Sequence, residues 1–326
     1  MIKRLICAVL LLTWMTGAAV ARPDYWAREW PNTDFTKTLI KWSDILDGGP
    51  PKDGIPAIDE PVFRPVGEIT GIADTEPVIG LIVGGEARAY PLQILMWHEI
   101  VNDTIGGVPV SVTFCPLCNA AIVFDRRVAG RVLDFGTTGK LRMSDLVMYD
   151  RQTESWWQQF LGQAIVGEMT GTTLKIMPSR LESFARFRAR TDATAKVLVP
   201  NAPGIRRYGA NPYIAYDSSD RPFLYRGELP DGVPPLMRVV SLGDRGAWTF
   251  AYMRKHRRVE LDDGTVITWE SGQNSALDSD EIATGRDVGN VLVQRRENGA
   301  WTDVAHGVDF AFAYHAFYPQ GAIHHP

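Results

Sequence analysis

Two cysteines stand two residues apart in the run Cys115-Pro116-Leu117-Cys118. That spacing lets the two sulfurs meet in a tight turn, so the pair can cycle between a dithiol and a disulfide. It also supplies two thiolate ligands to a soft metal ion. A static disulfide is the third interpretation, although so short a loop restrains the unfolded chain little and would stabilise the fold only weakly. We therefore favour redox chemistry over ligation and over a structural bridge.

Two histidines are candidates to act beside the cysteines. His98 lies between Trp97 and Glu99 in an expected helix ahead of the cysteine strand. It could carry the proton of a thiolate, serve as a third metal ligand, or simply pack in the core. His315 lies in an aromatic run, residues 310–318, that we expect to be a strand. If a metal is bound, we expect its ligands to come from Cys115, Cys118, His98 and His315.

Three further polar residues are candidates for binding a cofactor. Asn119 directly follows the second cysteine and could hydrogen-bond a thiolate or a ligand, or cap the turn. Arg126 would lower the pKa of a thiol beside it, or would mark a solvated strand end. Lys140 closes a glycine turn, residues 136–140, that could carry it towards an anionic ligand. That turn lacks the glycine spacing and the Ser or Thr of a phosphate loop.

Composition and missing motifs exclude several classes of protein. The chain has 326 residues and a net charge of −4, so it has no basic excess for nucleic acid. A second C-x-x-C is absent, which excludes a four-cysteine zinc site, and no histidine follows Cys118 for haem attachment. The signatures G-x-S-x-G and H-E-x-x-H are also absent, so serine hydrolases and zincins are not indicated.

The N-terminus has the pattern of an export signal. Residues 1–21 contain Lys3 and Arg4, then an apolar run, then Ala19-Val20-Ala21. Cleavage after Ala21 would remove Cys7 and leave only the C-x-x-C pair. We therefore expect a periplasmic or secreted protein in an oxidising compartment. No later segment has 18 consecutive apolar residues, so no integral membrane segment is expected after cleavage.

The rest of the chain predicts an α+β fold, mainly antiparallel β with short helices. Aromatic and apolar residues at spacings of three and four over 22–54 indicate an N-terminal helical arm. Strand-like runs separated by glycine turns follow within 55–326, which we expect to be a single compact domain. A helix is expected over 92–101.

The same order of elements recurs and suggests an internal duplication of two strand-rich halves. The pseudo-repeats cover about residues 76–135 and 236–295. Aligned without gaps, residues 113–121 share a threonine, an aromatic, an asparagine, a small residue and an alanine with residues 268–276. Both cysteines belong to the first copy.

Several motifs together resemble the bacterial and archaeal family known as domain of unknown function 3179. They are Trp97-His98-Glu99-Ile100-Val101-Asn102-Asp103, Thr113 to Asn119, Val123 to Arg126, Asp145 to Thr153, Trp156, Gly162, Gly167, Asn211-Pro212-Tyr213 and Phe317-Tyr318-Pro319. The resemblance covers roughly residues 55–320. Some relatives are described as selenoproteins with selenocysteine in the cysteine motif. The resemblance therefore implies that Cys115 and Cys118 are a reactive pair.

Taken together, the residues and the resemblance predict an exported thiol-based redox protein, a thiol oxidoreductase if it is an enzyme. One cysteine would attack and the other would resolve, with His98 as acid or base. The expected partner is a small molecule or a protein that carries a thiol or disulfide, and dithiol cycling requires no cofactor. The alternatives are a protein that binds a soft metal or metal cofactor, and a β-rich interaction module with a structural disulfide.

Overall fold

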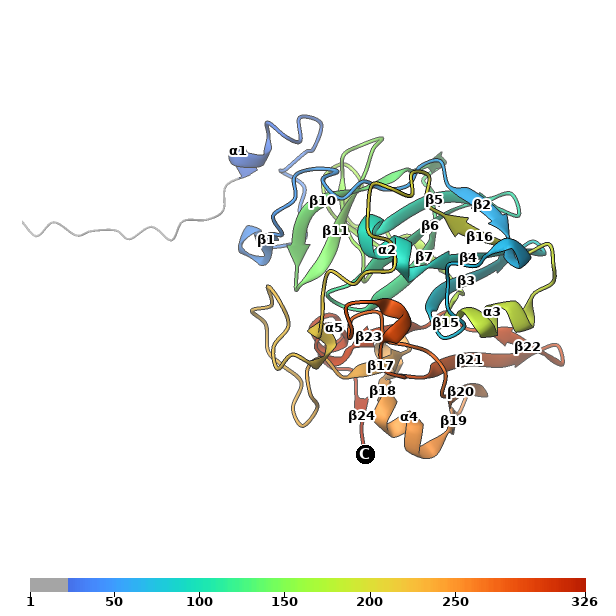
Figure 1. Ribbon diagram of the computed structural model, residues 1–326. Coiled ribbons are helices and arrows are strands. Elements are labelled where there is room, and N and C mark those ends of the chain that lie inside the picture. Colours follow the sequence, from blue (N-terminus) through green and yellow to red (C-terminus); the bar gives the residue numbers. More distant parts are fainter. Residues whose placement is uncertain (1–22) are drawn as a thin grey trace, which may run out of the picture.

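The computed structural model describes residues 23–326, an assembly of mostly antiparallel sheets with short helices (Figure 1). The predicted α+β class, mainly β, is confirmed. The expected signal peptide and Cys7 lie outside the described residues. Within the described part, no helix is long and apolar enough to cross a membrane.

The first half of the chain forms two sheets joined by a short helix. One sheet has the order β15-β3-β4-β16-β2 and the other the order β14-β7-β6-β5. Helix α2 (Leu92–His98) connects β4 to β5, and α3 (Phe184–Arg190) follows β15. The strands are β2 (Val62–Pro65), β3 (Pro77–Val83), β4 (Glu86–Pro91), β5 (Ile100–Ile105), β6 (Val108–Cys115), β7 (Ala120–Asp125), β14 (Lys175–Met177), β15 (Arg180–Ser183) and β16 (Lys196–Val199).

The second half repeats this arrangement with different residues. Its sheets have the orders β23-β17-β18-β24 and β19-β20-β21-β22, with α4 (Phe250–His256) between β18 and β19 and α5 (Ala311–Phe317) after β23. The strands are β17 (Arg238–Ser241), β18 (Ala247–Thr249), β19 (Arg258–Glu260), β20 (Thr265–Glu270), β21 (Asn290–Glu297), β22 (Ala300–Asp303), β23 (Gly307–Phe310) and β24 (Ile323–His324).

The two halves match in connectivity and in local detail. In each, the strand after the second helix pairs in parallel with the strand before the first helix, β16 with β4 and β24 with β18. Helices α2 and α4 are each followed by a residue with positive φ, Glu99 at 57° and Arg257 at 63°. The carbonyls of these two residues accept from Phe114 N at 2.8 Å and from Trp269 N at 3.0 Å. The repeated order spans residues 77–199 and 238–324.

A fifth large sheet is built mainly from strands inserted into the first half between β7 and β14, and β1 joins it from the N-terminal segment. Its order is β1-β10-β11-β12-β13, and it has no counterpart in the second half of the described chain. Its strands are β1 (Ile45–Asp47), β10 (Phe135–Arg142), β11 (Asp145–Asp150), β12 (Trp156–Gln158) and β13 (Gln163–Val166). The small hairpin β8 (Arg127–Val128) and β9 (Arg131–Val132) lies between β7 and β10. Figure 1 shows β10 and β11 beside the N-terminal segment.

The remaining elements are single turns of helix. These are α1 (Pro23–Trp26), η1 (Trp42–Asp44), η2 (Val66–Glu68), η3 (Tyr216–Ser218), η4 (Gly243–Arg245) and η5 (Ile282–Thr284). The prediction of a helical arm over 22–54 is therefore wrong for most of its length. Its aromatic residues surround one side chain, Trp156, instead of forming the stripe of a helix: ring centroids of Trp26, Trp30 and Phe35 lie 5.2, 5.4 and 5.5 Å from it.

Two local predictions are also corrected. The aromatic run at 310–318 is not a strand but the end of β23 followed by α5. A continuous apolar run carries no period that separates a buried strand from a buried helix. The expected glycine turn at 136–140 lies inside β10, where the pairing with β11 shifts register between Thr137 and Lys140.

Trp156 allows a test of the N-terminal packing. It is fully buried, whereas Trp301 on β22 is 48 % exposed. Trp156→Ala should lower the free energy of unfolding by about 3–5 kcal/mol, because a large cavity is left behind. Trp301→Ala should lower it by less than about 1 kcal/mol. Denaturant titration followed by circular dichroism measures both; equal losses would contradict this packing.

Candidate functional site

The cysteine pair occupies the turn between two buried strands. Cys115 is the last residue of β6, and Ala120 begins β7. The turn closes with a hydrogen bond from Asn119 N to Pro116 O at 3.2 Å, and Asn119 takes the left-handed conformation with φ of 52°. Both cysteines are free thiols; Cys115 is 2 % exposed and Cys118 is fully buried.

Asp145, at the start of β11, brings a carboxylate to the two sulfurs. One of its oxygens and the two Sγ atoms all lie within 4.8 Å of one another, and all three residues are buried. Its Oδ2 accepts from Gln158 Nε2 at 2.6 Å and from Phe160 N at 2.9 Å. Its Oδ1 has no hydrogen-bond partner. The inserted sheet therefore supplies one oriented carboxyl group to the cysteine turn.

Burial raises the pKa of every acidic group around this turn. It raises the pKa of Asp145 to about 7 and, with the charge of Asp145, that of Glu99 to about 8. Burial also raises the pKa of Asp309, on β23, to about 7. The pKa of Cys115 is raised, and that of Cys118 is raised well above its usual value, both mainly by burial. At neutral pH the site therefore holds two neutral thiols beside a carboxyl group that exchanges its proton.

The structure does not bring the candidate histidines into this cluster. The two ring nitrogens of His98 lie 2.8 Å from Pro56 O and 2.8 Å from Tyr208 Oη, and its pKa is lowered mainly by burial. His315 is a half-buried residue of α5. In the described chain, the convergent ligand group is Cys115, Cys118 and Asp145, with no histidine.

Asn119 holds the cysteine turn to the second half of the chain. Its Nδ2 donates to Val308 O at 2.8 Å, and its Oδ1 accepts from Arg238 Nη1 at 2.7 Å. Phe310 N donates to Cys118 O at 2.9 Å. Both the Nδ2 and the Oδ1 atom of Asn119 therefore have protein partners, and the residue positions the cysteine turn.

Arg126 and Lys140 lie in other surroundings. Arg126 follows the far end of β7 and donates to the carbonyls of Val110, Leu133 and Asp103. The Lys140 amine is buried, 3.9 Å from Glu29 and 3.8 Å from Asp47. Neither residue is part of the Cys115–Cys118–Asp145 group.

A long segment, residues 200–237, passes over the cysteine turn. Tyr216 Oη donates to Leu117 O at 3.0 Å, within the turn itself, and accepts from Phe223 N at 3.2 Å. Ser144, the residue before Asp145, donates its hydroxyl to Phe223 O. We call residues 200–237 the cover segment, since it is hydrogen-bonded both to the cysteine turn and to the residue before Asp145.

Sequence reasoning missed three members of this cluster. Asp145 opens β11 and directly precedes the apolar and aromatic run Leu146 to Tyr149; a carboxylate next to such a run is a signal that could have singled it out. Glu99 was not chosen as a site residue, because its neighbour His98 is the more common type of acid or base at neutral pH. Asp309 lies 191 to 194 residues beyond the cysteines, and no local pattern marks it.

The chain belongs to a known family without an assigned activity. The family described as "Protein of unknown function (DUF3179)" matches residues 52–321, most of the chain. Comparison with curated proteins and with solved structures gave no match.

The cover segment predicts a change in thiol reactivity. Tyr216→Phe removes two hydrogen bonds, so the cover should open more often and iodoacetamide should alkylate the cysteines roughly fivefold faster or more. The matched control is Tyr225→Phe, whose hydroxyl donates to Glu228 O within the cover segment itself. Mass spectrometry of timed samples measures the rates. Equal rates in both variants would show that Tyr216 does not restrain access.

The raised carboxyl pKa values predict a pH dependence of stability. The folded-state pKa of Asp145, about 7, exceeds its ordinary value of 3.8, so the folded state binds more protons between these pH values. Stability is therefore highest at low pH within this window and is lost as pH rises through about 7. Asp145→Asn should reduce this slope, to which Glu99 and Asp309 also contribute, while Asp231→Asn, at an exposed position, should leave it unchanged. Denaturant titrations at pH 5, 6, 7 and 8 measure the slope.

Proposed function

We propose that this protein is an exported thiol–disulfide oxidoreductase in which Cys115 and Cys118 cycle between dithiol and disulfide. The observation that carries the proposal is a buried carboxyl group with a pKa of about 7 in contact range of both thiols. A buried thiol with a raised pKa is a poor nucleophile until a base removes its proton. Asp145 is such a base, because its pKa lies close to the working pH.

The reaction is a two-electron exchange with a disulfide. The attacking cysteine passes its proton to Asp145, and its thiolate attacks one sulfur of the partner disulfide. The other sulfur of the partner leaves as a thiolate and takes up that proton from Asp145, which is ionised again. The second cysteine passes its proton to Asp145 and attacks the mixed disulfide. The partner's remaining sulfur leaves and receives that proton from Asp145. The cysteines end as a disulfide, and the partner ends as two thiols; reduction of an oxidised pair runs in reverse.

We assign the attack to Cys115 and the resolution to Cys118. Cys115 retains slight exposure and its pKa is raised less than that of Cys118. Both properties favour Cys115 as the sulfur that meets an incoming partner. The family supports a reactive pair, since some relatives are described with selenocysteine in this motif. The export signal expected over residues 1–21 would deliver the protein to an oxidising compartment.

A second candidate function is metal binding through the same residues. Two thiols and a carboxylate with an unpartnered Oδ1 form three donors of the kind that hold a divalent metal. A bound cation would also stabilise the ionised forms of groups that burial otherwise keeps protonated. Such a site would have three protein ligands, so a four-coordinate metal would have one position left for a further ligand.

The redox proposal predicts both a disulfide and a role for Asp145. In glutathione buffers, thiol trapping should detect an intramolecular disulfide whose potential lies above about −300 mV, the range of exchanging rather than structural bridges. Asp145→Asn should slow the exchange roughly 100-fold, because the base is lost. The rate of the wild type should rise with an apparent pKa near 7, and the variant should lack this inflection. Asp125→Asn is the matched control, a buried carboxyl at the far end of β7 that pairs with Arg127 and lies outside the three-residue group.

Two outcomes would contradict the redox proposal. One is a stoichiometric metal that the protein from its native compartment retains and that Cys115→Ser lacks; this result would establish the second candidate. The other is a reduction potential well below about −300 mV, combined with a reduced protein that differs from the oxidised one only in its stability. That result fits a structural bridge.

A further inference from the structure

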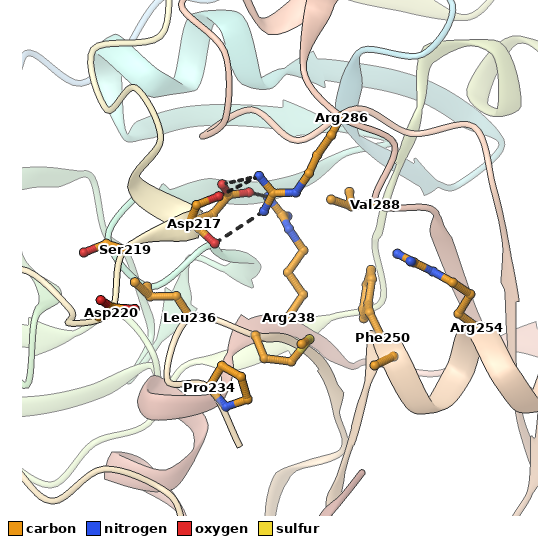
Figure 2. A pocket seen from close by; sticks show the side chains of 13 residues that line it. Asp217, Ser219, Asp220, Pro234, Leu236, Arg238, Phe250, Arg254, Arg286 and Val288 are labelled. Atoms are coloured by element: carbon orange, nitrogen blue, oxygen red, sulfur yellow. Dashed lines mark hydrogen bonds and ion pairs between the residues drawn. The ribbon is translucent and has the colours of Figure 1, made fainter. Parts of the chain in front are cut away.

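A cavity of about 300 Å³ lies between the cover segment and helix α4, apart from the cysteine thiols. Figure 2 shows Asp217, Ser219 and Asp220 on one side and Phe250 and Arg254 of α4 on the other. Between them, Pro234, Leu236, Met237 and Val288 provide an apolar lining. A cavity of this composition suits a small organic molecule with an apolar body.

Most of the charge in this cavity is already neutralised. Asp217 accepts from Arg286 Nη1 at 2.8 Å and lies 3.5 Å from Arg238 Nη2. Arg286 also pairs with Asp278. The dashed lines of Figure 2 mark the contacts of Asp217 with both arginines. These four residues, two arginines and two aspartates, together carry no net charge.

Two arginines of the cavity have donors without a protein acceptor in the described chain: Arg254 is exposed, and Arg238 is buried. Arg254 forms no ion pair within the described part of the chain; its guanidinium carbon lies 5.5 Å from the Trp269 ring centroid. In Figure 2 its side chain extends towards Phe250 and Val288. Arg238 is 6 % exposed, and its Nε–H has no hydrogen-bond partner. A buried donor without an acceptor is costly, so a ligand that accepts from it gains free energy.

We propose that this cavity binds a small organic anion, a carboxylate carried on an apolar body. The carboxylate lies at the Arg254 side, where it meets an unpaired guanidinium and completes the donors of Arg238. The apolar body lies against Phe250, Leu236 and Val288. Asp220 stands on the opposite side of the cavity and disfavours the reverse orientation. The argument for this site does not rest on the redox proposal, because none of these contacts involves a thiol or Asp145.

Calorimetric titration of the full chain with 3-phenylpropanoate tests the proposal, with neutral 3-phenylpropanamide as the paired probe. We expect the carboxylate to bind at least tenfold more tightly than the amide. Arg254→Ala should weaken carboxylate binding about tenfold, as loss of a charge-assisted hydrogen bond does. Arg254→Lys should retain part of the affinity. Lys255→Ala is the matched control, because it removes the same charge one residue further along α4 and does not line the cavity.

Ala251 provides a second test that leaves all charges in place. It lines the cavity from α4, so Ala251→Trp should fill the space and abolish binding, and circular dichroism checks that the variant is folded. The proposal is overturned if neither probe binds, if the amide binds as well as the carboxylate, or if Arg254→Ala binds like the wild type. Equal losses in Arg254→Ala and Lys255→Ala would also overturn it, since they indicate only long-range attraction.

Discussion

The site depends on how the cysteine turn is held against the second half of the chain. Phe310 N donates to the carbonyl of Cys118, and the Asn119 amide bridges Val308 O and Arg238 Nη1. These bonds satisfy backbone and amide groups that would otherwise be buried without partners, at a cost of about 1–3 kcal/mol each. They also fix the position of the turn that carries both thiols. Because Arg238 reaches from this turn to the separate cavity beside α4, one buried arginine contributes to both places.

The second constraint is the burial of acidic groups. Cys115, Cys118, Asp145, Glu99 and Asp309 meet where water is excluded, and burial raises the pKa of each. Arg142 lies nearby, but it donates to Gln158, which in turn orients Asp145. An arrangement of this kind is costly for folding and persists at functional sites, where a tuned proton affinity is useful. Both candidate functions use these raised pKa values. Thiol–disulfide exchange would move protons between the groups, and metal binding would replace the protons with a cation.

The sequence predicted the fold class and a strand that leads into the cysteine turn. Hairpins with glycine turns, such as β3 and β4, are readable because the period and the turn residues agree. The N-terminal arm was misread, because its aromatic residues pack around Trp156 from an irregular chain, and spacing alone cannot reveal that. Asp145 and Asp309 could not be assigned to the site, since they come from the inserted sheet and from the second half. His98 was chosen as an acid or base for its residue type and its position before the cysteines, yet its ring nitrogens are hydrogen-bonded to Pro56 and Tyr208.

What the sequence determined by itself is local: a reactive residue type at a spacing that closes a turn, and a family membership carried by short motifs. Both follow from neighbours along the chain. Tertiary structure alone decided which groups share the buried space with the thiols, because the repeated halves pack reciprocally, β7 against β23 and β21 against β15. It also decided the electrostatics of the site. The pKa of Asp145 depends on the water excluded around it, and that exclusion is created by segments far away in the chain.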